Sequence, residues 1–175
     1  MSYKKWVYKY KYLQVEFEEV KHQKDKYLKE FERLFTFKDK KPSQTVKDAI
    51  EESNKPKPKV PKQKNTKNLY KKLSKKVHPD RGGSNEEFVE LNELYEEGDL
   101  LGMITKAEDY DIDTTEFKED KVELEFEHSC WMLEEKTKEM QQTLAWKWGT
   151  AQDKDKQGLK QMFEHMYGLI PKEDI

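Results

Sequence analysis

The sequence is poor in the residues that mark several classes of protein. It has one cysteine, Cys130, which excludes an intrachain disulfide and any metal site built from a cysteine cluster. Its seven glycines and six prolines are too few for the many turns of an all-β fold. It contains no run of about 18 apolar residues, so it predicts no membrane-spanning helix. Its basic start lacks an apolar stretch and a small-residue cleavage site, so no secretory signal is expected.

Apolar residues are also scarce, whereas charged residues are abundant. Hydrophobic residues make up 34% of the 175 residues and charged residues 40%, with a net charge of -2. So few apolar residues favour thin layers of helices over one thick core. The predicted fold class is therefore all-α, with an antiparallel helical hairpin flanked by long amphipathic helices like those of coiled coils. The composition fits a reducing cytoplasm and identifies no function.

The order of patterns along the chain predicts four segments. Apolar residues recur every three or four positions from Tyr12 to Phe37, which indicates one long amphipathic helix. Ser43 or Thr45 can cap a short helix that runs through Ile50. Three prolines and several lysines then predict an extended, solvated linker. The segments are an N-terminal helical segment (1–53), the linker (54–65), a hairpin with a following helix (66–112) and a C-terminal helical region (113–175).

The stretch "YKKLSKKVHPDRGGSNEEFVELNELYEEGDL" changes from strongly basic to strongly acidic at His-Pro-Asp. Pro79 ends a first helix, because the residue before a proline is pushed out of the α region. Ser84 or Asn85 can cap a second helix, and Gly98 can close it. Apolar residues can pack between the two helices and hold them in antiparallel order. They are Leu69, Leu73, Val77, Phe88, Leu91 and Tyr95. This pattern fits an ordinary solvated hairpin and equally a recognition element displayed at a hairpin tip.

Further helices are expected after the hairpin. Asp99 can cap a third helix with an inner face of Leu100, Leu101, Ile104 and Ala107. The region from Thr114 to Trp148 has an imperfect helical period, which predicts an irregularity near His128–Cys130. Its apolar positions include Val122, Leu124, Phe126, Trp131 and Leu133. A last short helix ends near Gly168. The four tryptophans are expected in the core or as hairpin anchors.

The hairpin residues resemble a known family. "LYKKLSKKVHPDRGG" followed by "EEFVELNELYEEG" resembles the J domain of DnaJ-type co-chaperones over Thr66 to Glu97. The match covers the basic second helix, the His-Pro-Asp loop and a third helix with Phe88, Leu91 and Tyr95 in register. The following "LYEEGDLLGMITKAEDYDID" resembles the ending of J domains in some bacterial and phage proteins.

The sequence also departs from that family. The proline and lysine linker stands where a J domain has its first helix, and it cannot form that helix. The Gly/Phe-rich stretch and the cysteine-rich zinc module of full-length DnaJ are missing. Another segment must therefore cover the apolar seam of the hairpin: the N-terminal helix, residues 46–50 or the C-terminal helices.

The resemblance implies a function. The partner would be a DnaK-type heat-shock ATPase, and His78, Pro79 and Asp80 would dock where its ATPase domain, interdomain linker and substrate domain meet. Docking would promote ATP hydrolysis by the partner. The electrostatic docking face would consist of Lys71, Lys72, Lys75, Lys76 and Arg81. The protein itself would be no enzyme and need no cofactor, and its flanking helices would select an unidentified client or location. The expected compartment is the cytoplasm of a bacterial cell or a phage-infected host.

Other functions receive less support from the residues. The lysine-rich run 55–76 can attract nucleic acid, but the acidic segment after Ser84 would repel a phosphate backbone. The rival hypothesis is a structural or nucleic-acid-binding helical protein whose J-like hairpin is not coupled to a chaperone. The histidines lack metal-ligand spacing, and no nucleophile lies in a catalytic motif. The histidines are His22, His78, His128 and His165.

Overall fold

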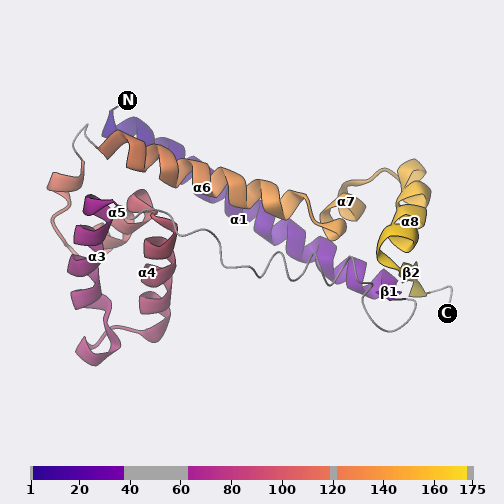
Figure 1. Ribbon diagram of the computed structural model, residues 1–175, viewed down its shortest axis with the longest axis horizontal. Coiled ribbons are helices and arrows are strands. Elements are labelled where there is room, and N and C mark those ends of the chain that lie inside the picture. Colours follow the sequence, from indigo (N-terminus) through magenta and orange to yellow (C-terminus); the bar gives the residue numbers. More distant parts are fainter. Residues whose placement is uncertain (1, 38–62, 119–121, 173–175) are drawn as a thin grey trace. The chain divides into compact units, whose positions relative to one another are not determined.

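The computed structural model describes residues 2–37, 63–118 and 122–172, and it is mostly helical, which confirms the predicted all-α class (Figure 1). In chain order its elements are α1 (Tyr3–Leu34), β1 (Phe35–Phe37), α3 (Lys64–Val77), η1 (Pro79–Arg81), α4 (Asn85–Glu97), α5 (Leu100–Asp109), η2 (Thr115–Phe117), α6 (Glu123–Gln141), α7 (Leu144–Thr150), α8 (Asp153–Tyr167) and β2 (Leu169–Pro171), where η marks a 3-10 helix. No described helix has the length and apolar character that crossing a membrane requires.

The chain divides into two compact units. The first unit consists of Met1–Phe17 and Pro58–Lys136, and the second of Glu18–Lys57 and Thr137–Ile175. The predicted helix ending at Ile50 and almost all of the predicted linker lie outside the described residues. The four predicted segments remain a prediction about how the chain is organised.

The first helix begins well before its predicted start. α1 starts at Tyr3 rather than Tyr12, and the prediction was wrong because lysines between the aromatic residues hide the apolar stripe. Trp6, Tyr10 and Leu13 lie on one face of the helix at spacings of four and three, and they are buried. The predicted helical end is also wrong, since residues 35–37 form strand β1.

α3 and α4 form the predicted hairpin in the first unit. Leu69, Leu73, Val77 and Leu91 are fully buried between the elements of this unit. The N-cap of α4 is Ser84: its Oγ accepts a hydrogen bond from the Glu87 N–H at 3.1 Å, and the Glu87 carboxylate accepts one from the Ser84 N–H at 3.3 Å. Gly98 closes the helix in the left-handed conformation at φ 70°. Both predicted boundaries are confirmed.

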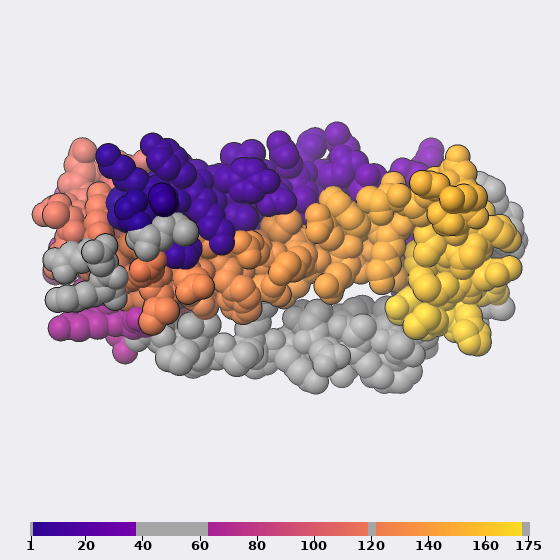
Figure 2. Space-filling view, turned by 90° about the horizontal axis from the view of Figure 1, so that it is seen from above, coloured from indigo at the N-terminus to yellow at the C-terminus, as the bar shows by residue number. Residues whose placement is uncertain are grey.

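The start of α1 and the first part of α6 supply the cover that the hairpin lacks. Their buried side chains join one hydrophobic cluster with α3, α4 and α5. The two helices also contact each other, through the rings of Tyr3 and Phe126 at 5.6 Å and an ion pair from Lys9 to Glu134 at 2.9 Å. Figure 2 shows the indigo start of α1 against the orange α6. Of the three segments that were candidates to cover the hairpin, the N-terminal helix and the C-terminal helices therefore both do so.

α6 also packs on the hairpin through buried polar groups. The Glu125 carboxylate accepts hydrogen bonds from the Asn65 amide at 2.8 Å and the Thr66 hydroxyl at 2.9 Å. These two donors lie in the first turn of α3. The Ser129 hydroxyl accepts a hydrogen bond from the Leu101 N–H at 3.1 Å in the first turn of α5. α6 thus fixes the starts of two helices.

The predicted irregularity near His128–Cys130 is wrong. α6 is continuous, and the helical pattern breaks later, where the Thr143 hydroxyl caps α7 by accepting the Trp146 N–H. The imperfect period comes from Leu124 and Trp131, which are 74% and 50% exposed. They lie nearly opposite the buried stripe of α6, so neither belongs to the apolar core. That stripe consists of Phe126, Cys130 and Leu133, and it continues Val122, which is buried just before the helix.

The second unit has its own aromatic core. The Phe35 ring stacks on Phe31 at 4.7 Å and meets Trp148 and Phe163 edge-on at 4.9 and 5.6 Å. β1 and β2 pair in antiparallel order, with Phe35 opposite Pro171. These three-residue strands were not predicted, because they are too short to show an alternating pattern. The predicted helix end at Gly168 is confirmed.

Candidate functional site at the hairpin tip

The backbone between α3 and α4 closes on itself. His78 leaves the helix with ψ 132°, as its position before Pro79 requires, and its N–H still donates to the Ser74 carbonyl at 3.1 Å. The Arg81 and Gly83 N–H groups both donate to the His78 carbonyl, at 2.9 and 3.2 Å. The tip is therefore one ordered 3-10 turn whose backbone polar groups are largely satisfied internally.

Two glycines shape this turn for different reasons. Gly82 has φ 92°, a left-handed conformation that side chains with a Cβ rarely adopt. A Cβ added to Gly83 would lie 2.1 Å from the Val77 carbonyl oxygen, closer than any real contact. The Arg-Gly-Gly sequence thus lets the chain turn sharply and then pass directly over the end of α3.

The imidazole of His78 is held from two sides. Its Nδ1 accepts a hydrogen bond from the Asp80 N–H at 3.2 Å, which places the proton of the neutral ring on Nε2. Its ring meets Phe88 of α4 edge-on at 4.9 Å. Phe88 was not predicted to belong to the site, because its contact with His78 forms only when the two helices of the hairpin pack together.

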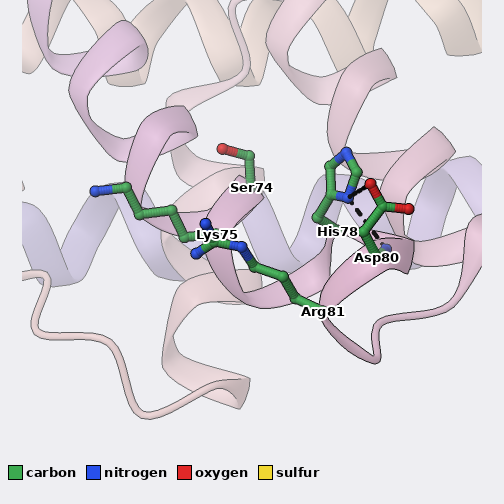
Figure 3. Close-up of a pocket in the computed structure, with 5 residues that line it drawn as sticks. All are labelled: Ser74, Lys75, His78, Asp80 and Arg81. Atoms are coloured by element: carbon green, nitrogen blue, oxygen red, sulfur yellow. Dashed lines mark hydrogen bonds and ion pairs between the residues drawn. The ribbon is translucent and has the colours of Figure 1, made fainter.

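The carboxylate of Asp80 projects into solvent. Its side chain is 88% exposed, and its Oδ2 lies 3.6 Å from Nδ1 of the His78 ring. An open pocket of about 300 Å³ lies beside it, lined by Ser74, Lys75, His78, Asp80 and Arg81. In Figure 3 the Arg81 side chain runs from the loop back toward Lys75, while His78 and Asp80 form the other side. The pocket thus has cations on one side and a carboxylate on the other.

The five predicted docking cations do not have equivalent surroundings. All five are exposed. Lys72 forms an ion pair with Glu116 at 2.5 Å and lies 5.1 Å above the Phe117 ring. The other four form no ion pair within the described ranges: Lys71, Lys75, Lys76 and Arg81. Glu116 was not predicted to belong to the site, because it lies far along the chain, in η2, and only the fold brings it to α3.

Comparisons with protein-family models, curated proteins and solved structures give no match to this chain. The tip residues and their geometry are therefore the basis for assigning a function.

Proposed function

We propose that the protein is a J-domain co-chaperone that docks on a DnaK-type heat-shock ATPase and stimulates its ATP hydrolysis. The observation that carries this proposal is the Asp80 carboxylate, 88% exposed in the middle of a turn that is closed by its own hydrogen bonds. A charged group in such a fixed position loses little conformational entropy when a partner binds it. It can then form a charge-assisted hydrogen bond with a cationic donor of the partner.

The cations beside the tip support the same proposal. Lys71 and Lys75 lie one turn apart on α3, and Arg81 lies beside Lys75 in the tip pocket. Exposed cations of this kind accelerate the encounter with an acidic surface and orient it, although each pair adds little affinity. The ATPase would therefore present an acidic face to α3 and a cationic group to Asp80.

The flanking helices serve as the adaptor in this proposal. The start of α1 and the first part of α6 cover the hairpin through the buried cluster shared with α3, α4 and α5, while Asp80 projects into solvent. Client selection or localisation would then depend on the flanking helices. The partner belongs to the cytoplasm of a bacterial cell or a phage-infected host, and the protein would act there.

The test is the substitution Asp80→Asn, which keeps the size of the side chain and removes its charge. We expect single-turnover ATP hydrolysis by a DnaK-type protein to lose its stimulation, while the thermal unfolding of the variant stays as in the wild type. Asp109→Asn, at an exposed aspartate of α5, is the matched control and should stimulate normally. Normal stimulation by the Asp80 variant would contradict the proposal.

A second measurement separates the rival hypothesis. Stimulation should fall as salt is raised, because the docking cations act through a screened field. Replacing Lys71 and Lys75 with Glu should produce the same loss at low salt. If these replacements instead abolish binding to DNA or RNA while stimulation survives, a nucleic-acid-binding protein is the better description.

A further inference from the structure

The start of α1 has exposed aromatic side chains that do not pack against the hairpin. Tyr8 is 72% exposed and Tyr12 66%, in a helix whose opposite face is buried. They lie four residues apart on the outward side, with Val15 one further turn along. Large apolar or aromatic side chains grouped on a helix surface commonly mark a binding site.

Three lysines surround these two rings. At 100° per residue, Lys4 and Lys11 flank Tyr8 on one side, and Lys5 flanks Tyr12 on the other. All three are exposed, and they form no ion pair within the described parts of the chain. The sequence has no acidic residue before Glu16. We call Lys4, Lys5, Tyr8, Lys11 and Tyr12 the tyrosine–lysine face.

The neighbouring Lys9 shows what the other three lysines lack. It pairs with Glu134 of α6 at 2.9 Å, and the pKa of Lys9 is raised, chiefly by this hydrogen bond. Its charge is therefore matched within the protein. By contrast, no described residue pairs with the three lysines of the tyrosine–lysine face. An anionic ligand could neutralise their charge.

We propose that the tyrosine–lysine face binds single-stranded nucleic acid. The three lysines would contact phosphates, and the tyrosine rings would stack on bases, which is how proteins hold single strands without reading their sequence. The two tyrosines lie about 6 Å apart along the helix axis, so each ring can receive a different base of one strand.

Two other anionic partners fit this face less well. A membrane surface requires a continuous apolar side that enters the lipid, but here only Val15 lacks a polar atom among the outward residues. An acidic protein segment would need the lysines and would gain no stacking from the rings. This binding is separate from docking at Asp80, so either activity can fail without the other.

The experiment measures the fluorescence anisotropy of a labelled oligo(dT) titrated with the full-length protein. We expect binding whose logarithmic affinity falls linearly with the logarithm of salt concentration. Replacing Tyr8 and Tyr12 together with Leu should weaken binding by about tenfold or more, whereas replacing both with Phe should preserve it. Replacing Lys4, Lys5 and Lys11 with Gln should lower the salt slope by about 0.7 for each phosphate that the protein no longer neutralises.

The matched control is the Lys71→Glu and Lys75→Glu variant of α3, which should bind oligo(dT) as the wild type does. ATPase stimulation should be unchanged in the tyrosine variants, which separates this proposal from the function of the tip. The proposal is overturned by absence of oligo(dT) binding at low salt, or by binding that depends on α3 and not on α1. Equal binding by the Leu and wild-type proteins, with displacement by polyglutamate, would assign the face to acidic proteins instead. Tyrosine-dependent binding that anionic vesicles compete away and oligo(dT) does not would assign it to membranes.

Discussion

The hairpin carries two aspartates in opposite surroundings: Asp80 is exposed at its tip, and Asp99 is buried at its base. The side chain of Asp80 is 88% exposed, whereas Asp99 is 4% exposed. The Asp99 carboxylate caps α5 by accepting the Gly102 N–H at 2.9 Å, and it accepts the Tyr10 hydroxyl of α1 at 2.5 Å. Burial raises the pKa of Asp99, and the hydrogen bond from Tyr10 opposes that rise.

The difference separates two uses of one carboxylate. A buried carboxylate must be hydrogen-bonded, so Asp99 ties α1 to the start of α5 and its loss should be felt in stability. An exposed carboxylate contributes little to stability, so Asp80 is free to serve a partner. Substitutions at the base should therefore change folding, and substitutions at the tip should change docking.

The largest effect on stability is expected when α1 and α6, which cover the hairpin, are removed. A fragment of residues 64–112 keeps α3, α4 and α5 but lacks the buried side chains of α1 and α6, each worth roughly 1.5–3 kcal/mol when fully buried. We expect this fragment to be largely unfolded and to melt without a cooperative transition, as followed by circular dichroism. A sharp transition in the fragment would show that the tip is carried by an independent module.

A smaller effect is expected from one core side chain. Leu73 is fully buried in the seam, and Leu73→Ala should lower the free energy of unfolding by about 2–5 kcal/mol, since it removes apolar contacts and leaves a cavity. Urea denaturation measures the change. Val89→Ala is the control on the same hairpin: Val89 is 55% exposed, and its loss should cost no more than about 0.5 kcal/mol.

Next in size is the loss of one buried hydrogen bond. Tyr10→Phe removes the hydroxyl that donates to Asp99, which should lower the free energy of unfolding by about 1–3 kcal/mol at pH values where the Asp99 carboxylate is charged. Because that bond opposes the rise in the pKa of Asp99, it stabilises the charged carboxylate. The loss should therefore be greatest above the folded pKa and shrink below pH 3.8, the ordinary value, where Asp99 is protonated.

The stability of the wild type should itself depend on the protonation of Asp99. The folded pKa of Asp99 is raised above its ordinary value, so its contribution to stability is complete below pH 3.8 and is lost as pH rises through the folded pKa. The control is Tyr12→Phe on the same helix, where the side chain is 66% exposed and no such pH dependence is expected. An equal loss at both ends of the pH range in Tyr10→Phe would remove Asp99 from the explanation.

The tip was more predictable from the sequence than the base. Pro79 and Ser84 act on their immediate neighbours, so the helix boundaries at the tip follow from local rules and were confirmed. The base depends on contacts between distant residues, such as the hydrogen bond from Tyr10 to Asp99. Asp99 was predicted only as a helix cap, and nothing local indicated its burial or its partner in α1.

The same limit explains the wrong helix boundaries. The alternation of lysine and aromatic residues before Tyr12 hid a stripe that is visible only once α6 and the hairpin are known to lie against it. Trp131 looked like a core residue because of its type, yet it lies on the outer side of α6. Residue type and spacing predict that a helix forms, whereas the side that is buried depends on its neighbours.

The smallest effect on stability is expected at Lys72. This residue also tests whether the cations beside the tip act in docking rather than in folding. Its ion pair with Glu116 is exposed, so Glu116→Gln should change the free energy of unfolding by about 0–1 kcal/mol. The change would nevertheless release one cation of the proposed docking face. We expect faster association with the DnaK-type ATPase at low salt and no difference at high salt, measured by stopped-flow kinetics. Glu134→Gln is the control, since it releases Lys9 of α1, whose side chain is 44% exposed like that of Lys72, from an ion pair away from the tip cations. If both variants accelerate association equally, the net charge of the protein steers docking rather than the cations of α3. The tip would then have no electrostatic role that distinguishes it from the base.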